Sequence, residues 1–256
     1  MSVDQLRLVI SAESSGGTHT SRTMMLAELS QLLAAVAPDA KQIEYKTAII
    51  DLNCLGKGTL TGRQRAYRYL RELYALDPDH PAFRALRDLW DVDDVARPLL
   101  AVLCALARDP LLRATTDSVI DAPEGSLVNA TMLAQAVQRA YPGSYSDGIA
   151  AKIGRNAAST WTQSGHLAGR AHKTRTCVTA TPSALALALL IGNTEGLRGA
   201  QLFSSQWCRV LDRDPDSLAG LAVRASQRGL IEYRHAGGVT EVGFKLLLRP
   251  FDREQQ

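Results

Sequence analysis

The amino-acid sequence predicts a mainly α-helical protein with β-hairpins confined to its C-terminal half. Apolar residues recur at helical spacing along most of the chain, whereas strand signals are nearly absent from the first half and become clear after residue 168. With 256 residues, of which 46% are hydrophobic, the chain can bury a substantial core. Its longest apolar runs, residues 98–107 and 184–192, are about half of the roughly 20 residues that span a bilayer. We therefore expect buried core helices there and no membrane contact.

Residues 1–125 are expected to form a helical N-terminal domain. A Ser/Gly-rich joint at residues 11–21 precedes a first helix over residues 21–37, in which apolar side chains recur at helical spacing. Further helices are expected over residues 63–76, 80–90, 93–109 and 110–121. Strand signals are nearly absent from this region, so it is interpreted as a helical bundle. The segment APEGS, residues 122–126, is the expected domain boundary.

Residues 126–181 are expected to form a first small module. Helices are predicted over residues 127–141, 146–153 and 156–167, with Gly154 supplying a sharp turn and Asn156 a cap. A basic segment rich in Thr and Val follows from Gly169 and has the composition of a β-ribbon. Three helices followed by a ribbon are the pattern of a winged helix, a form of helix-turn-helix.

Residues 182–256 repeat this pattern. Helices are predicted over residues 182–193, 204–212 and 216–229, followed by a hairpin that turns at the AGG segment of residues 236–238. In the last of these helices Leu218, Leu221, Ala222 and Ala225 form a continuous apolar stripe. The predicted fold class is therefore mainly α: an N-terminal helical bundle followed by two winged-helix (helix-turn-helix) modules with short β-hairpin wings.

Charge is distributed unevenly along the chain. The whole protein has a net charge of +3, but residues 1–125 sum to −3 and residues 126–256 to +6. Residues 148–194 contain no Asp or Glu, although five Lys or Arg lie among them. Such a window, placed on a predicted third helix and its wing, favours contact with a polyanion, and we expect that partner to be double-stranded DNA. The alternative is that these are ordinary solvated surface charges.

The candidate DNA-binding residues follow from this placement. Short polar side chains on a third helix can reach base edges, and basic side chains around it neutralise phosphates. The candidates are Lys152, Arg155, Asn156, Ser159, Thr160, Thr162, Gln163, Arg170, Lys173 and Arg175 in the first module, Arg224, Gln227 and Arg228 in the second, and Lys57 and Arg63 near the Arg-rich helix of residues 63–76. That last helix has an alternative interpretation as a solvated face, because acidic residues follow it closely.

The sequence carries no recognisable catalytic grouping. The segment GKGT, residues 56–59, is not a phosphate-binding loop, because Asp51 stands where the first glycine of G-x-x-x-x-G-K-[ST] is needed and Gly58 follows Lys57. The five histidines are scattered and are expected at the surface, and the four cysteines lack metal-ligand spacing. We therefore expect no enzymatic activity, no cofactor, no metal and free thiols. With no signal peptide visible, a cytoplasmic location is expected.

Several stretches together resemble a known family. The segments IIDLNCLGKGTLTGRQRAYRYLRELYAL, WTQSGHLAGRAHKTRTCVTATP, GLRGAQLFSSQWCRVLD and LAVRASQRGLIEYRHAGGVTEVGF are similar to those of BrxA, the small helical component of BREX phage-defence islands. The resemblance covers roughly residues 20–247. It implies a helical body with winged-helix-like modules, binding to double-stranded DNA, and a non-catalytic part in phage restriction and host-DNA modification with other BREX proteins.

Other functions remain open at the level of sequence. Winged helices also bind proteins, so the chain could be an assembly module whose acidic N-terminal half docks a partner. A transcriptional regulator is a variant of the DNA-binding interpretation. We expect residues from about Pro123 onward to supply most of the DNA affinity, provided that their core is not shared with the first half.

Overall fold

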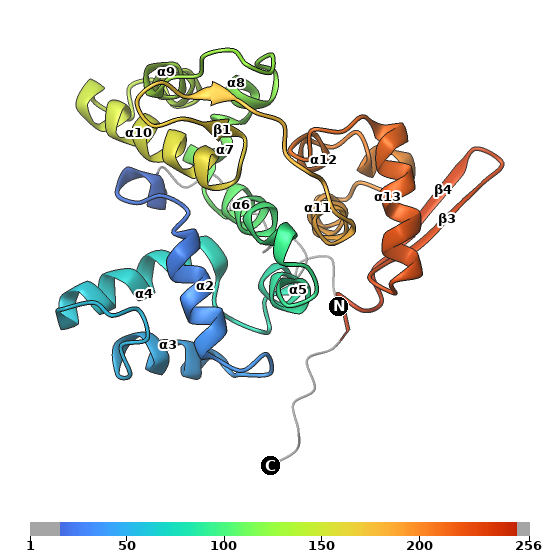
Figure 1. The fold of residues 1–256 in the computed structure, drawn as a ribbon, viewed down its shortest axis with the longest axis horizontal. Helices are drawn as coiled ribbons and strands as arrows, with labels where there is room; N and C mark the ends of the chain where they lie inside the picture. Colours follow the sequence, from blue (N-terminus) through green and yellow to red (C-terminus); the bar gives the residue numbers. More distant parts are fainter. Residues whose placement is uncertain (1–15, 250–256) are drawn as a thin grey trace.

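The computed structural model describes residues 16–249 and is mainly helical (Figure 1). The described part contains twelve α-helices, three short 3-10 helices and two antiparallel hairpins. In chain order they are η1 (Thr18–Thr20), α2 (Leu26–Ala35), α3 (Gln42–Ile50), α4 (Leu60–Tyr74), α5 (Pro81–Trp90), η2 (Asp94–Ala96), α6 (Arg97–Arg108), α7 (Pro110–Arg113), α8 (Thr116–Ile120), α9 (Ala130–Ala140), α10 (Asp147–Gln163), β1 (Leu167–Ala168), β2 (Thr174–Arg175), α11 (Pro182–Thr194), η3 (Gly199–Leu202), α12 (Gln206–Arg209), α13 (Pro215–Gln227), β3 (Glu232–Ala236) and β4 (Val239–Gly243).

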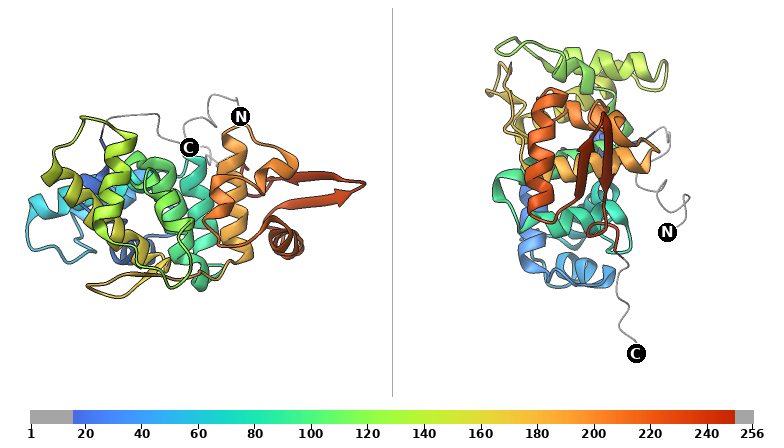
Figure 2. Two further views of the ribbon diagram at one scale, coloured as in Figure 1. Left: turned by 90° about the horizontal axis from the view of Figure 1, so that it is seen from above. Right: turned by 90° about the vertical axis from the view of Figure 1, so that its right-hand side faces the viewer.

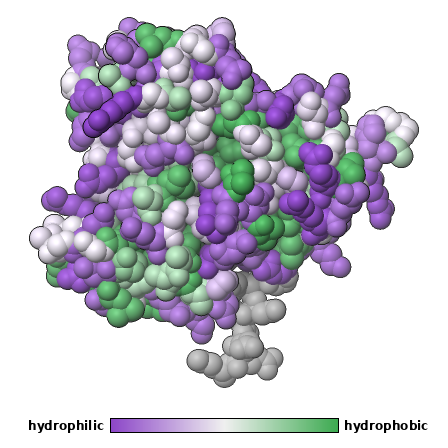
Figure 3. Space-filling view, in the orientation of Figure 1, coloured by the Kyte–Doolittle hydropathy of each residue, from purple (hydrophilic) through white to green (hydrophobic). Residues whose placement is uncertain are grey.

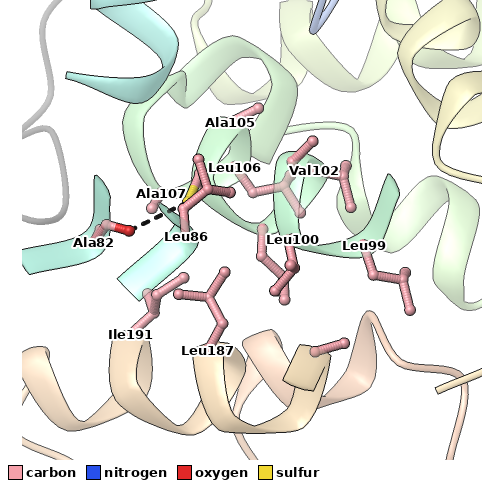
Figure 4. Close-up of a cluster of buried hydrophobic side chains, with 14 of the residues drawn as sticks. Ala82, Leu86, Leu99, Leu100, Val102, Ala105, Leu106, Ala107, Leu187 and Ile191 are labelled. Carbon is pink, nitrogen blue, oxygen red and sulfur yellow. Dashed lines mark hydrogen bonds between the residues drawn. The ribbon is translucent and has the colours of Figure 1, made fainter. Parts of the chain in front are cut away.

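Helices α6 and α11 form the centre of the molecule, as their apolar sequences predict. Every residue of α11 is buried, and α6 is buried from Leu99 to Ala107. Figure 4 shows Leu187 and Ile191 of α11 facing Leu86 of α5 and Leu100 of α6. One contiguous cluster of buried residues extends from Met24 to Leu247. The first half of the chain therefore shares its core with the second. The expectation that residues from about Pro123 onward supply most of the DNA affinity required a core that is not shared, and this requirement is not met.

The N-terminal helices lie on one side of α6. Helix α3 was missed in the sequence, although Tyr45, Ala48 and Ile49 repeat at helical spacing and are all buried. The guanidinium of Arg87, on α5, donates to the carbonyls of Leu33 and Val36 at 3.1 Å each. These carbonyls belong to the end of α2, so the buried cation satisfies acceptors that the helix leaves free.

The first small module differs from its prediction at the second and third helices. Residues 147–163 form one helix, α10, and the predicted turn at Gly154 and cap at Asn156 are wrong. A Cβ at Gly154 would lie 2.2 Å from the carbonyl oxygen of Ala130. The glycine is thus explained by the close crossing of α9 and α10, since only a residue without a side chain fits there.

The hairpin after α10 consists of two short strands, and a third segment of the chain pairs with it through a single residue. Strands β1 and β2 pair antiparallel, with Leu167 opposite Arg175. Leu127, which precedes α9, forms a further antiparallel bridge to Thr174. The chain order of this region is therefore helix α8, edge segment, helices α9 and α10, and hairpin.

In the second small module three helices and a hairpin lie where the sequence predicts them, but the middle helix, α12, is shorter than predicted and the 3-10 helix η3 was not predicted. The stripe of α13, Leu218, Leu221, Ala222 and Ala225, is buried. Strands β3 and β4 pair from Glu232 opposite Gly243 to Ala236 opposite Val239, so the turn consists of Gly237 and Gly238. Both glycines have positive φ, as a two-residue hairpin turn requires. Figure 2 shows this hairpin extending away from the helices.

Candidate nucleic-acid interface

The outer side of α10 carries an exposed row of basic and small polar residues. Lys152, Arg155, Ser159 and Thr162 recur at helical spacing and so share one side, here called the α10 face. Lys152 and Arg155 are exposed, whereas Ser159 and Thr162 are half-buried. The opposite side of the helix carries Ile153, Ala157 and Trp161, which are all buried.

The loop between β1 and β2 covers the C-terminal end of the α10 face. The ammonium of Lys173 donates to the Thr162 hydroxyl at 2.7 Å and to the carbonyl of Gly169 at 3.3 Å. Gly169 has a φ of 98°, and a Cβ there would lie 2.2 Å from the His172 carbonyl oxygen. The glycine therefore allows the tight loop that brings Lys173 onto α10 and that carries the exposed Arg170.

The basic side chains of the α10 face and of the hairpin loop form no ion pair with an acidic residue within the described part of the chain. None of the salt bridges within residues 16–249 involves Lys152, Arg155, Arg170 or Lys173. The nearest acid along α10 is Asp147, which begins the helix and accepts from the amide of Gln138 at 2.9 Å. Lys152, Arg155 and Arg170 are thus exposed to an anionic partner, and the half-buried Lys173 adds a fourth positive charge that has no acidic partner within residues 16–249.

A neighbouring side of α10 is occupied by the protein's own N-terminal segment, residues 17–26. Asn156 donates to the carbonyl of His19 at 2.8 Å, and Gln163 accepts from the backbone of Leu26 at 3.1 Å. Thr160 is fully buried, and its hydroxyl lies 2.7 Å from Nε2 of His19. The expectation that Thr160 is exposed is therefore wrong, and the amides of Asn156 and Gln163 hold the chain rather than extending into solvent.

His19, Asp109 and Thr160 form a buried network. Nδ1 of His19 lies 2.8 Å from Oδ2 of Asp109, and its Nε2 faces Thr160. Burial raises the pKa of Asp109, but the contacts to His19 outweigh it and hold the pKa below its ordinary value. The order carboxylate, imidazole and hydroxyl resembles a nucleophile relay. However, the Thr160 hydroxyl also accepts from the backbone of Met24 at 2.9 Å and has no solvent access, so the network joins η1, the start of α7 and α10.

Arg175 is buried and paired, contrary to the expectation that it contacts phosphate. Its guanidinium forms a bidentate ion pair with the carboxylate of Asp212, and both side chains are at most 5% exposed. The same carboxylate accepts from the backbone of Val178 at 2.9 Å. Asp212 therefore fixes the segment that connects β2 to α11 against the end of α12.

His166 is a second buried contact between the two modules. Its Nε2 donates to the carbonyl of Val210 at 2.8 Å, and its ring packs edge-on against Trp161 with centroids 5.0 Å apart. Two of the five histidines, His19 and His166, are thus buried rather than at the surface as predicted. Burial lowers the pKa of His166 to about 4, so the imidazole is neutral in the folded protein at neutral pH.

We expect His166 to make the protein less stable as the pH falls from about 6.5 to about 4. In this window the unfolded chain binds a proton that the folded chain does not, which costs about 3 kcal/mol of unfolding free energy in total. Urea unfolding at several pH values should show this slope in the wild type. His166→Gln should flatten the slope in the same window, and parallel curves for the two proteins would show that His166 is not responsible.

The remaining predicted residues lie apart from the α10 face. Arg224 and Gln227 are exposed on α13 and Arg228 directly after it, where the surface is largely hydrophilic (Figure 3). Their surroundings are of mixed charge, since Asp214, Asp216, Glu232 and Glu241 belong to the same module and are also exposed. In the N-terminal half, Lys57 pairs with Glu28 at 3.1 Å, and Arg63 donates to the carbonyl of Ile50 at 2.6 Å. The structure thus assembles only part of the predicted set into one surface.

Comparison of the sequence with protein-family models and with curated proteins finds no match. In the described part of the chain no helix is long and apolar enough to span a membrane. Among the same residues no group of three or more His, Cys, Asp or Glu is arranged to hold a metal ion.

Proposed function

We propose that the protein binds double-stranded DNA through the α10 face and the adjoining hairpin loop. The observation that carries this proposal is the exposure of Lys152, Arg155 and Arg170 together with Lys173 on adjacent elements, without an acidic partner in the described ion pairs. A duplex presents closely spaced phosphates with condensed counterions around them. When basic side chains bind these phosphates the counterions are released, and this release favours binding.

The order of elements supports a winged-helix arrangement for this site. An edge segment at Leu127, the helix pair α9 and α10, and the β1–β2 hairpin follow helix α8. In winged helices the last helix enters the major groove while the wing contacts the backbone. We assign these two roles to α10 and to the loop of residues 169–173. The second module, with α11, α12, α13 and the β3–β4 hairpin, has the same order.

We further propose that recognition depends only weakly on DNA sequence. The amides of Asn156 and Gln163 and the hydroxyl of Thr160, which could otherwise read base edges, contact the N-terminal segment. Ser159 and Thr162 are the short polar residues left on the α10 face. Cationic side chains therefore dominate the surface, and phosphate contacts carry affinity without direct sequence information.

The biological setting is proposed from the BrxA resemblance alone. In that setting the protein is a cytoplasmic, non-catalytic accessory component of a BREX-type system that contributes to phage restriction and host-DNA modification with other BREX proteins. A protein-interaction role is the second candidate, and a specific observation favours it for the second module. That module combines mixed charge with the exposed apolar side chains Val223 and Val239.

The proposal is tested by removing the four cations in the intact chain. Lys152, Arg155, Arg170 and Lys173 are changed together to Gln, and duplex affinity is titrated over a range of salt. If all four contact phosphates, the slope of log affinity against log salt should decrease by about 0.9 per contact. Arg175 is left unchanged because it is buried.

A matched control changes four exposed cations of the second module, Arg224, Arg228, Arg234 and Lys245, to Gln. The loss of charge is equal, so a similar loss of slope in both variants would show that the α10 face contributes no more than the second module and would contradict its assignment as the principal site. Failure of the wild type to bind any duplex at low salt would reject the DNA-binding proposal and favour the protein-interaction role.

A further inference from the structure

Arg22 meets Arg68 and Tyr69 of α4, which lie more than forty residues later in the sequence. The guanidinium of Arg22 lies 5.7 Å from the ring centroid of Tyr69, and that of Arg68 lies 4.6 Å from it. Arg22 belongs to the segment before α2, whereas Arg68 and Tyr69 belong to α4. The three residues are called the Arg–Tyr stack below.

The cations of the Arg–Tyr stack are only weakly neutralised. Arg22 is exposed and forms none of the ion pairs found within residues 16–249. Nε of Arg68 approaches Glu72 at 3.7 Å, with both side chains about half exposed, and Glu72 also accepts from the Thr18 hydroxyl at 2.8 Å. An exposed ion pair of this length contributes little. Contact with the aromatic ring restrains each guanidinium, and both exposed side chains still present N–H donors to solvent.

The N-terminal segment places the stack next to the α10 face. Helix η1 contacts both α4 and α10, and in Figure 1 it lies between them, in blue. His19 accepts from Asn156 of α10, while Thr18 donates to Glu72 of α4. Arg22 follows within a few residues and reaches Tyr69. The segment that covers one side of α10 therefore carries a further cation toward α4.

We propose that the Arg–Tyr stack is a second phosphate-contacting surface for the same duplex that binds the α10 face. Arg65, exposed one turn before Arg68, extends this surface along α4. A duplex backbone fits the stack better than a small anion, because the stack offers separate donors on two elements rather than one enclosed pocket. The DNA footprint is then longer than a single helix and wing would give. This inference rests on the proposed function.

The test changes Arg22 and Arg68 to Gln in the full chain and measures affinity for a duplex of about three helical turns over a range of salt. Two lost phosphate contacts should lower the salt slope by about 1.8. The Lys variant, Arg22→Lys with Arg68→Lys, keeps both charges and should retain most of the slope. The control changes Lys46 and Arg213, two exposed cations elsewhere, to Gln and should leave the slope nearly unchanged. Thermal melting verifies that all variants fold.

The outcomes separate this inference from the proposed function. If the wild type binds and the α10 variant loses slope while Arg22→Gln with Arg68→Gln does not, the second surface is rejected and the first remains. If the Lys variant loses as much as the Gln variant, packing rather than charge is responsible, and the inference is also rejected. If the wild type does not bind duplex DNA at all, both proposals fail together.

Discussion

Asp212→Asn should lower the free energy of unfolding by about 3 kcal/mol or more, although it changes only one atom of the side chain. The substitution leaves the guanidinium of Arg175 as a buried cation without a counter-charge, and breaking a buried pair in this way costs about 3–5 kcal/mol. Urea denaturation of the wild type and the variant at neutral pH measures the difference.

The choice of Asn isolates the loss of charge from other effects. Asp212 has a φ of 52°, a left-handed conformation that Asn also tolerates, so the backbone should not be strained by the change. Asn can still accept a hydrogen bond from the backbone of Val178. An apolar replacement would instead mix the loss of the ion pair with loss of this bond and with an altered backbone.

A matched control exists on the surface. Arg209 pairs with Asp117 at 3.1 Å and with Asp121 at 2.6 Å, and both carboxylates are more than 60% exposed. Asp117→Asn removes the same charge from an exposed pair and should cost about 0–1 kcal/mol. If Asp212→Asn costs no more than this control, Arg175 is not held by a buried charge pair and would again be available to an external phosphate.

The central helices and the second module could be predicted from sequence because their signals are local. The apolar run of α11 and the buried stripe of α13 depend only on the spacing of their own residues. The turn of the β3–β4 hairpin is equally local, since paired glycines supply the two positive φ values that it needs.

The composition of the candidate site could be predicted only in part. Three of the five cations in the acid-free window of residues 148–194, Lys152, Arg155 and Arg170, are exposed on α10 and its hairpin loop. Which members are exposed depends on partners far away in sequence. Thr160 is covered by His19, 141 residues earlier, and Arg175 pairs with Asp212, 37 residues later. Arg22 was missed because nothing near it in sequence indicates that it meets Tyr69.

Gly154 shows how one residue type supports two local interpretations. A glycine between helical segments is compatible with a sharp turn, but it is equally compatible with a close helix crossing. The sequence around Gly154 favours neither, because the deciding contact is made by Ala130 and Ala134 on α9. These two small residues at helical spacing are the one signal that could have indicated the crossing.

Gly154→Ala should therefore destabilise the protein by about 2 kcal/mol, although alanine is the better helix former. Its Cβ would lie 2.2 Å from the carbonyl oxygen of Ala130 and 2.9 Å from the amide nitrogen of Ala134. Both are backbone atoms that cannot rotate away, so α9 must shift. Overpacking of this kind costs about 1–3 kcal/mol or more, which outweighs the gain of up to about 1 kcal/mol in helix propensity.

The control for this prediction is Gly220→Ala, in the interior of α13. No atom lies within 4 Å of the Cβ position at Gly220, and the residue is exposed, so only the gain in helix propensity should remain. Urea denaturation should thus show opposite signs for the same substitution in two helices. A gain in stability from Gly154→Ala would mean that α9 and α10 do not cross at this point.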